Sequence, residues 1–398
     1  MHQTHNLQQR MRIFISIFLP ILIYQLANFS ASFVDTTMTG QYDTLHLAGV
    51  SMATSLWIPF FDLLIGIVSA LVPIIGHHLG QGKKEKIASD FYQFIYLSLG
   101  LSLILFALVF VGAPLVLSHL GLEPLVEEVA KNYLWYLALG IIPLLLFSTI
   151  RSLFDALGLT KLSMYLMLLL LPLNGTFNYA LIYGAFGFPE MGGAGAGLGT
   201  SLAYWVLLLI SLLVAVKHPK IRAYELWKIR SLDKKGLIEG VRLGLPIGGT
   251  FFAEVVIFSV VGLVMAKFSS LIIASHQAAM NFSNLMYAFP MSISTSMSII
   301  VSYEIGANRP DDVKKFCKLG RLTALGIAGF TFLFLYILRD RVAALYGSDT
   351  EFIRMTSVFL TYSLFFQLAD TFAAPLQGIL RGYKDTQVPF YLGLIAYW

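Results

Sequence analysis

Charged residues and cysteine are both scarce in this chain. Of its 398 residues only 12% are charged and 57% are hydrophobic, whereas about 25% of a soluble globular domain is charged. The single cysteine, Cys317, excludes an intrachain disulfide and a thiolate metal cluster. These deficits argue against a soluble domain and against a disulfide-stabilised secreted protein. They indicate a polytopic membrane protein, in keeping with a mean hydropathy of +0.75.

The sequence also lacks a convincing cleavable leader. Its first apolar run, Ile13 to Val34, is longer than the core of a signal peptide and has no small-residue cleavage site after it. We therefore expect this run to be a true membrane span. The later apolar runs reach the ~20 residues that a helical span needs, and they do not alternate between polar and apolar residues. This pattern favours helices over a membrane barrel.

Eleven predicted spans, the last incomplete, cover residues 13–37, 47–75, 91–117, 130–150, 162–184, 195–216, 239–266, 273–303, 319–338, 353–379 and a start at 386. Basic residues in cytoplasmic loops exceed those in outer loops in most membrane proteins. With the N-terminus inside, 22 of the 27 basic residues fall on the inner side, and the outer side holds Lys131, Lys267, Arg339, Arg341 and Arg354. The net charge of +5 is therefore a topology signal of a cytoplasmic-membrane protein, and we expect no nucleic-acid partner.

An internal repeat relates the two parts of the chain. Leu19-Pro20-Ile21 returns as Leu245-Pro246-Ile247, a shift of 226 positions, and the same shift places Leu79-Gly80 on Ile305-Gly306. The predicted fold is an all-α polytopic membrane protein of two pseudo-symmetric six-helix bundles, at residues 1–216 and 237–398, joined by a cytoplasmic basic linker at 217–236. By this repeat the second bundle would end near position 442. We therefore expect twelve spans in the complete fold, with about 10.5 present and the chain truncated before the twelfth.

Two acids lie well inside predicted spans of the second bundle. An ionised carboxylate at the bilayer centre costs roughly 2.5–3.5 kcal/mol on insertion scales, so Glu254 and Asp370 must face protein, water or a cation. The span assignments place no Lys or Arg beside them inside the membrane, which favours a monovalent cation site over structural ion pairs. Gln277, with Asn281 and Ser283, is a candidate source of neutral oxygens. Asp62 in the second span has no assigned role.

A second polar group is predicted in the outer part of the first bundle. Asn174 and Asn178 are four residues apart, so they share one face of the fifth span, where they can meet Asp35 from the first span. Two plainer interpretations remain open at this point. Asp35 can simply reach interfacial water at a helix end, and buried amides often do no more than bond one helix to another.

No enzyme is predicted from the remaining residues. The histidines His77, His78 and His276 have no carboxylate or cysteine at metal-ligand spacing, and no nucleophile and base are paired. The glycine run at 192–199 lacks the lysine and the strand of a nucleotide-binding loop and suits close helix packing. Two functions other than cation-dependent transport remain open for a membrane protein with these acids. A lipid-linked saccharide flippase would call for cationic residues in its cavity, and an intramembrane enzyme would use Glu254 with Asp370 as a diacid.

Several motifs together resemble the multidrug and toxic compound extrusion (MATE) family, within it the NorM-like branch. They are Phe33-Val34-Asp35-Thr36-Thr37-Met38-Thr39-Gly40, Gly76-His77-His78-Leu79-Gly80-Gln81-Gly82, Gly244-Leu245-Pro246 before Glu254, His276-Gln277 before Pro290, and Asp370 before Gln377-Gly378-Ile379-Leu380-Arg381-Gly382. These motifs extend over nearly the whole chain in the family's order. The sequence departs from the pattern at Phe366, where a tyrosine hydroxyl for the cation is expected.

The resemblance implies a monomeric antiporter that exports amphipathic, often cationic small molecules, with Na⁺ or H⁺ as coupling ion and no other cofactor. Membrane lipid and the exported compound are the implied partners. Glu254 and Asp370 resemble the family's cation-coupling acids, with Gln277 near them. Asp35, with Asn174 and Asn178, resembles its substrate or proton acid. Asp349, in an outer loop, resembles an acidic substrate contact.

Overall fold

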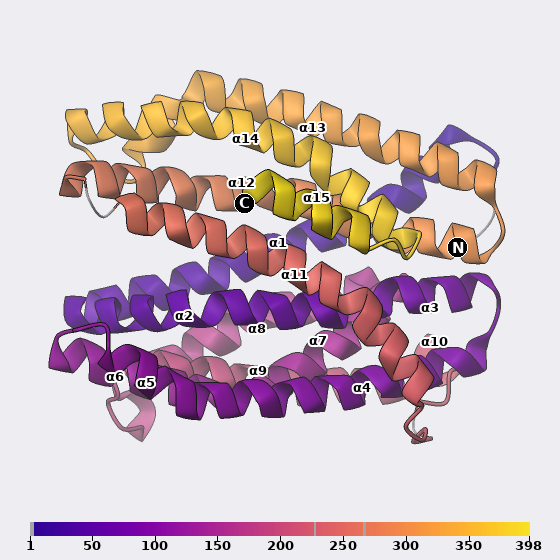
Figure 1. Ribbon diagram of the computed structural model, residues 1–398, viewed down its shortest axis with the longest axis horizontal. Helices are drawn as coiled ribbons and strands as arrows, with labels where there is room; N and C mark the ends of the chain where they lie inside the picture. Colours follow the sequence, from indigo (N-terminus) through magenta and orange to yellow (C-terminus); the bar gives the residue numbers. More distant parts are fainter. Residues whose placement is uncertain (1–3, 227, 266–267) are drawn as a thin grey trace.

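A computed structural model describes residues 4–226, 228–265 and 268–398, and every regular element in these ranges is helical (Figure 1). The first half of the chain contains α1 (Leu7–Tyr42), α2 (Thr44–Ser69), α3 (Leu71–Gly80), α4 (Lys84–Ala107), the π-helix η1 (Leu108–Gly112), α5 (Ala113–Ser118), α6 (Pro124–Ala138), α7 (Ile141–Ala156), α8 (Thr160–Ile182), the 3-10 helix η2 (Ala185–Gly187), α9 (Gly193–Lys217) and α10 (Pro219–Arg222). The second half contains α11 (Lys234–Met265), α12 (Ser270–Gly306), α13 (Pro310–Ala344), α14 (Thr350–Gly382) and α15 (Gln387–Tyr397).

The helices agree with the eleven predicted spans. Within the described ranges, nine helices are long and apolar enough to cross a membrane, and α6 with α7, bent by 49°, forms a tenth candidate. The shorter apolar helix α15 occupies the predicted start of the eleventh span. The helices run several residues beyond the predicted boundaries, because polar residues continue them past the apolar core. Lys267, predicted on the outer side, lies outside the described residues.

Tight turns with local caps connect the long helices. Asp43 ends α1 and begins α2, and its Oδ1 atom accepts hydrogen bonds from the backbone N–H groups of Leu45 and His46. Such a cap satisfies donors that the first turn of a helix leaves without partners. Gly158, between α7 and α8, has a φ of +71°. Glycine adopts this left-handed conformation readily because it has no Cβ. The turns are thus short enough to hold successive helices antiparallel.

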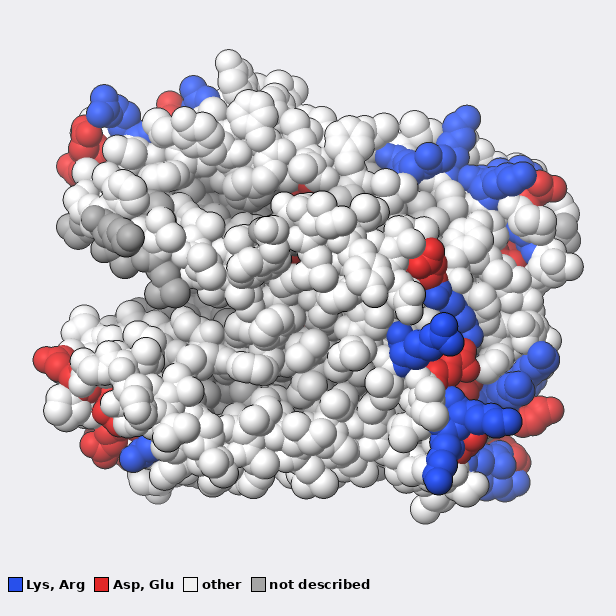
Figure 2. Space-filling view, in the orientation of Figure 1, with Lys and Arg blue, Asp and Glu red and all other residues white. Residues whose placement is uncertain are grey.

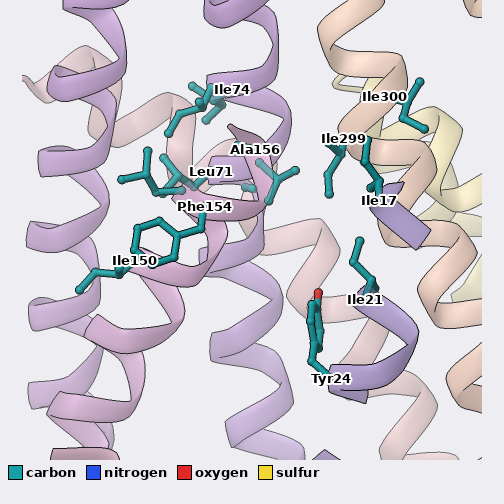
Figure 3. Close-up of a cluster of buried hydrophobic side chains, with 14 of the residues drawn as sticks. Ile17, Ile21, Tyr24, Leu71, Ile74, Ile150, Phe154, Ala156, Ile299 and Ile300 are labelled. Atoms are coloured by element: carbon teal, nitrogen blue, oxygen red, sulfur yellow. The ribbon is translucent and has the colours of Figure 1, made fainter. Parts of the chain in front are cut away.

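Basic residues gather at one end of the molecule, at the right of Figure 2, and we call this the basic end and the opposite one the far end. Near the basic end the two halves share a buried apolar core. Ile17 on α1 faces Ile299 and Ile300 on α12, and Leu71 and Phe154 belong to the same cluster (Figure 3). The core therefore crosses the boundary between the two halves instead of filling each one separately.

Small residues allow the halves to approach most closely toward the basic end. A Cβ added at Gly80 would lie 2.2 Å from the carbonyl oxygen of Tyr303, and one added at Gly76 would overlap Ser302. Further from that end, a Cβ at Gly66 on α2 would lie 2.5 Å from the Cα of Gly248 on α11. At the far end, by contrast, the surface is hollowed between the two halves (left in Figure 2). The structure is thus closed at the basic end and open at the far end.

Candidate functional site

The first polar group joins α1, α8 and α9 near the far end. The side-chain amide of Asn178 donates to Oδ1 of Asp35 at 2.5 Å and to Oδ1 of Asn174 at 3.1 Å. Asn174 in turn donates to the hydroxyl of Thr200 at 3.0 Å. Both asparagines are buried, at 2% and 0% exposure. The structure therefore brings together the three residues that the sequence placed in this group.

Thr200 is a member of this group that the sequence analysis did not identify. It follows Gly199, where an added Cβ would lie 2.2 Å from Oδ1 of Asn178. The glycine is thus what lets α9 approach the amide closely enough for Thr200 to reach Asn174. The glycine run indicated close packing of this helix, but the hydroxyl next to it carries no distinguishing signal in the sequence.

The second polar group lies between α11 and α14. The carboxylates of Glu254 and Asp370 are close enough to interact electrostatically. Phe258 and Phe366, each one turn from these acids toward the far end, pack with ring centroids 6.5 Å apart. The ring of Phe366 therefore faces another ring at the position where a tyrosine hydroxyl was expected. Two carboxylates on facing helices, beneath an aromatic pair, suit a small cation.

Two further residues, Arg381 and Asp62, interact electrostatically with Glu254. Arg381, predicted on the inner side just beyond the span at 353–379, lies inside the last turn of α14 with 7% exposure, and its guanidinium sits 4.8 Å from the ring centroid of Phe251. It is thus part of the helix at the basic end, because α14 continues to Gly382. Arg381 interacts electrostatically with Glu254 and with Tyr287 of α12. Asp62, from α2 of the first half, also interacts electrostatically with Glu254.

The structure does not bring Gln277 to the two acids. The ring of His276, the residue before it, packs edge-on against Phe359 with centroids 5.4 Å apart. Phe359 precedes Asp370 by eleven residues on α14, which is roughly 16 Å along a helix. Gln277 is exposed and lies toward the far end. Tyr287 of α12, not Gln277, lies at the level of the carboxylates.

The predicted substrate contact Asp349 and the predicted neutral ligands Asn281 and Ser283 have other hydrogen-bond partners. Asp349 is exposed and caps α14, where its Oδ2 atom accepts from the backbone N–H of Phe352 at 3.0 Å. Oδ1 of Asn281 accepts from the Tyr346 hydroxyl at 3.1 Å, and Ser283 donates to a carbonyl of its own helix. Asp349 thus serves a helix end, and Asn281 and Ser283 make hydrogen bonds within and between helices of the second half.

A buried acid that the sequence analysis overlooked lies toward the basic end of the first half. Asp155 on α7 is 3% exposed and accepts from the Tyr24 hydroxyl at 3.2 Å and from the Ser163 hydroxyl at 2.6 Å. The guanidinium of Arg151 lies 5.1 Å from the ring centroid of Tyr24. This network ties α1, α7 and α8 together. The span boundaries predicted from hydropathy left Asp155 in a loop.

The adjacent residues His77 and His78 make polar contacts through their ring nitrogens. Nε2 of His77 lies 2.8 Å from the carbonyl oxygen of Gly382, across the boundary between the halves, and Nδ1 of His78 lies 2.5 Å from Oδ2 of Asp90. Within the described ranges, no group of three His, Cys, Asp or Glu residues is arranged to hold a metal ion. His77 thus joins the end of α14 to α3.

A sequence model of the MatE family matches residues 20–180 and 246–398. The two matched segments begin 226 residues apart, which is the shift found for the internal repeat. Each half therefore carries one copy of the family's unit.

Curated relatives match the whole chain. It is 71% identical to the "Probable multidrug resistance protein NorM" of Streptococcus pneumoniae (strain ATCC BAA-255 / R6), over 100% of this chain and 88% of that protein. It is 41% identical to the protein of the same name from Halalkalibacterium halodurans, over 100% of this chain and 87% of that protein. A solved structure, "MATE in the straight conformation", superposes with a TM-score of 0.88 at 16% identity, covering 98% of this chain and 86% of that one. The chain therefore belongs to the MATE family of membrane transporters.

Proposed function

We propose that this transporter is a cation-coupled antiporter, driven by Na⁺ or H⁺, that exports amphipathic cationic drugs and toxic compounds across the cytoplasmic membrane. The 71% identical relative is named a multidrug resistance protein, which supports this substrate class. The concentration of Lys and Arg at one end (Figure 2) supports an orientation with the basic end and the N-terminus inside. In this proposal, residues 1–216 and 237–398 are the two lobes, joined by the linker at 217–236.

The pairing of Glu254 with Asp370 inside membrane-spanning helices carries the proposal. Two like charges in a poorly hydrated site repel each other, and a bound Na⁺ or proton relieves that repulsion. Arg381 interacts electrostatically with Glu254, and one monovalent cation offsets one of the two carboxylate charges. Binding of the cation changes the charge between α11 and α14 and thereby shifts the equilibrium between far-side-open and basic-side-open states.

Asp35 provides a separate acid in the other half for the substrate or a proton. Its carboxylate accepts from Asn178, and the amide network behind it reaches α8 and α9. Because the two acid groups belong to different halves, the exported compound and the coupling ion need not share ligands. They compete through the conformational equilibrium that both of them bias. Asp349, exposed at the far end, is in this proposal at most an entry or exit contact.

Efflux of a cationic dye in vesicles tests the proposal, with the Na⁺ gradient and the pH gradient imposed separately. Glu254→Gln and Asp370→Asn keep the side-chain shape but remove the charge, so each should abolish gradient-driven efflux while the protein remains folded. Glu351→Gln, at an exposed position in the first turn of α14, is the matched control and should pump at the normal rate. Normal coupled efflux by Glu254→Gln would show that the proposed coupling site is wrong.

A further inference from the structure

The segment that precedes α1 is anchored on the opposite half of the molecule. The hydroxyl of Thr4 donates to Oδ1 of Asp312 on α13 at 3.2 Å, and Nε of Arg10 donates to the Thr4 hydroxyl at 3.1 Å. Arg10 also lies 3.8 Å from the same Asp312 oxygen. The three residues are 5–9% exposed. Figure 1 shows the start of the chain beside the basic end of α13, at the upper right.

The segment that precedes α11 is anchored in the same manner on the first half. Gln93 of α4 bonds it twice, since its amide donates to the Ser231 carbonyl at 3.0 Å and its Oε1 accepts from the Asp233 backbone at 2.8 Å. The hydroxyls of Tyr92 and Tyr96 donate to the carbonyls of Leu226 and Arg230, each at 2.6 Å. Gln93 is 1% exposed. The linker is thus bound along α4 and does not hang free between the halves.

The two anchors are counterparts under the internal repeat. The shift of 226 positions that places α1 on α11 also places α4 on α13. α1 therefore begins against α13 of the second half, and α11 begins against α4 of the first half. Contacts between the two halves continue beyond the two anchors. Ile17 of α1 packs on α12 (Figure 3), and Gly240 of α11 packs against the ring of Phe94 on α4.

We propose that these two anchors form a reciprocal latch that holds the basic end closed and must release for the cavity to open toward that side. The inference rests on the alternating access of the proposed function. The anchor on α13 crosses between the halves, and the anchor on α4 holds the linker on the first half directly before α11 begins. Separating the basic end therefore breaks these contacts or strains the first turns of α1 and α11. The polar atoms of the anchor on α13 are buried and those of the anchor on α4 are partly buried. Release of the first anchor therefore also requires its rehydration, which water supplies only as the basic end opens.

The two anchors differ in their chemistry. The anchor on α13 depends on one carboxylate and one guanidinium, whereas the anchor on α4 uses uncharged hydroxyl, amide and carbonyl groups. Hydrogen bonds to charged groups are about twice as strong as neutral ones. The single substitution Asp312→Asn should therefore weaken the latch about as much as Tyr92→Phe and Tyr96→Phe combined.

Distances between spin labels at the two ends test the latch. In a Cys317→Ser background, cysteines at the exposed positions Lys84 and Lys314 report the opening of the basic end, and cysteines at Leu120 and Leu345 report the far end. Asp312→Asn should raise the population of the long basic-end distance about tenfold. The far-end distance should shorten in parallel, which mere local fraying of the first helix would not cause.

Matched variants separate the latch from general effects of charge. Asp311→Asn removes the neighbouring first-turn carboxylate of α13, which is exposed, and should leave both distances unchanged. Tyr92→Phe with Tyr96→Phe removes only two hydroxyls and should act like Asp312→Asn. If Asp312→Asn and the tyrosine variant both leave the two distances unchanged while the proteins stay folded, the latch is refuted. Dye efflux that still depends on Glu254 in that case would leave the proposed function standing.

Discussion

The close crossing of α3 and α12 depends on the absence of a side chain at Gly80. Gly80→Ala adds a Cβ 2.2 Å from the Tyr303 carbonyl oxygen, 2.6 Å from the Ala307 nitrogen and 2.8 Å from the Gly306 carbonyl carbon. All three are backbone atoms of the last turn of α12 and its C-cap residue Ala307, so no side-chain rotation relieves the overlap. Relief requires the two helices to separate by about 1 Å at this point.

The cost of that separation falls on the state that is closed at the basic end. Overpacking a close contact typically costs about 1–3 kcal/mol, which corresponds to roughly a 5- to 150-fold change in an equilibrium constant. Once the basic end opens, α3 and α12 part and the added methyl group has room. Gly80→Ala should therefore shift the population toward the state open at the basic end, and it should slow export because the transporter leaves that state less readily.

The label pair at Lys84 and Lys314 measures this population, and dye efflux measures the consequence. Gly100→Ala is the matched control, since a Cβ there meets nothing within 4 Å, and the change gains up to about 1 kcal/mol of helix propensity. The reasoning fails if Gly80→Ala folds normally and yet gives the same distance distribution as Gly100→Ala. That result would mean that the crossing adapts without opening.

Two further predictions concern the buried polar networks of the first half. Gly199→Ala displaces the Asn178 side chain, so it should weaken dye export, whereas Gly175→Ala, with open space around it, should not; equal efflux by the two variants would count against a role for this amide. Tyr24→Phe leaves the buried carboxylate of α7 with one donor fewer and should lower the free energy of unfolding by about 1–3 kcal/mol, as measured by denaturant titration in detergent. Tyr165→Phe, at a 61% exposed tyrosine, is the control and should change stability little.

The sequence was sufficient for the spans because a bilayer demands long apolar helices. It was also sufficient for the repeat, since Pro20 and Pro246 mark the same place in each copy. Glu254 and Asp370 stood out because charge is costly at that depth. Their neighbours were less accessible, because a residue such as Tyr287 is ordinary in a membrane helix and its relevance depends on how α12 is rotated about its own axis.

Residues near the ends of spans were the hardest to assign. Arg381 and Asp155 both lie where hydropathy changes from apolar to polar, and hydropathy alone cannot distinguish a side chain that reaches water from one that turns inward. Burial of Arg381 depends on Phe251 of another helix, and burial of Asp155 depends on hydroxyls from α1 and α8. Such partners come together only when the helices pack, so no local pattern in the sequence records them.

The internal repeat explains why the two copies have small residues at the crossing of α3 and α12, whereas their acidic residues differ. Gly76 and Ser302 are counterparts under the shift of 226, as are Gly80 and Gly306, and the first pair meets directly. A position on a pseudo-twofold axis must face its own counterpart, so only small residues satisfy both copies at close approach.

Away from that axis, a residue does not contact its counterpart in the other copy, so the two copies can differ in sequence. Glu254 falls on Asn28 and Asp370 on Leu144 under the same shift, so the acids of the second half have no equivalents in the first. The symmetric crossing holds the halves together at the basic end. In the proposed antiport mechanism, the asymmetric acids would give each half a different ligand, because two identical lobes would give the ion and the exported compound the same site.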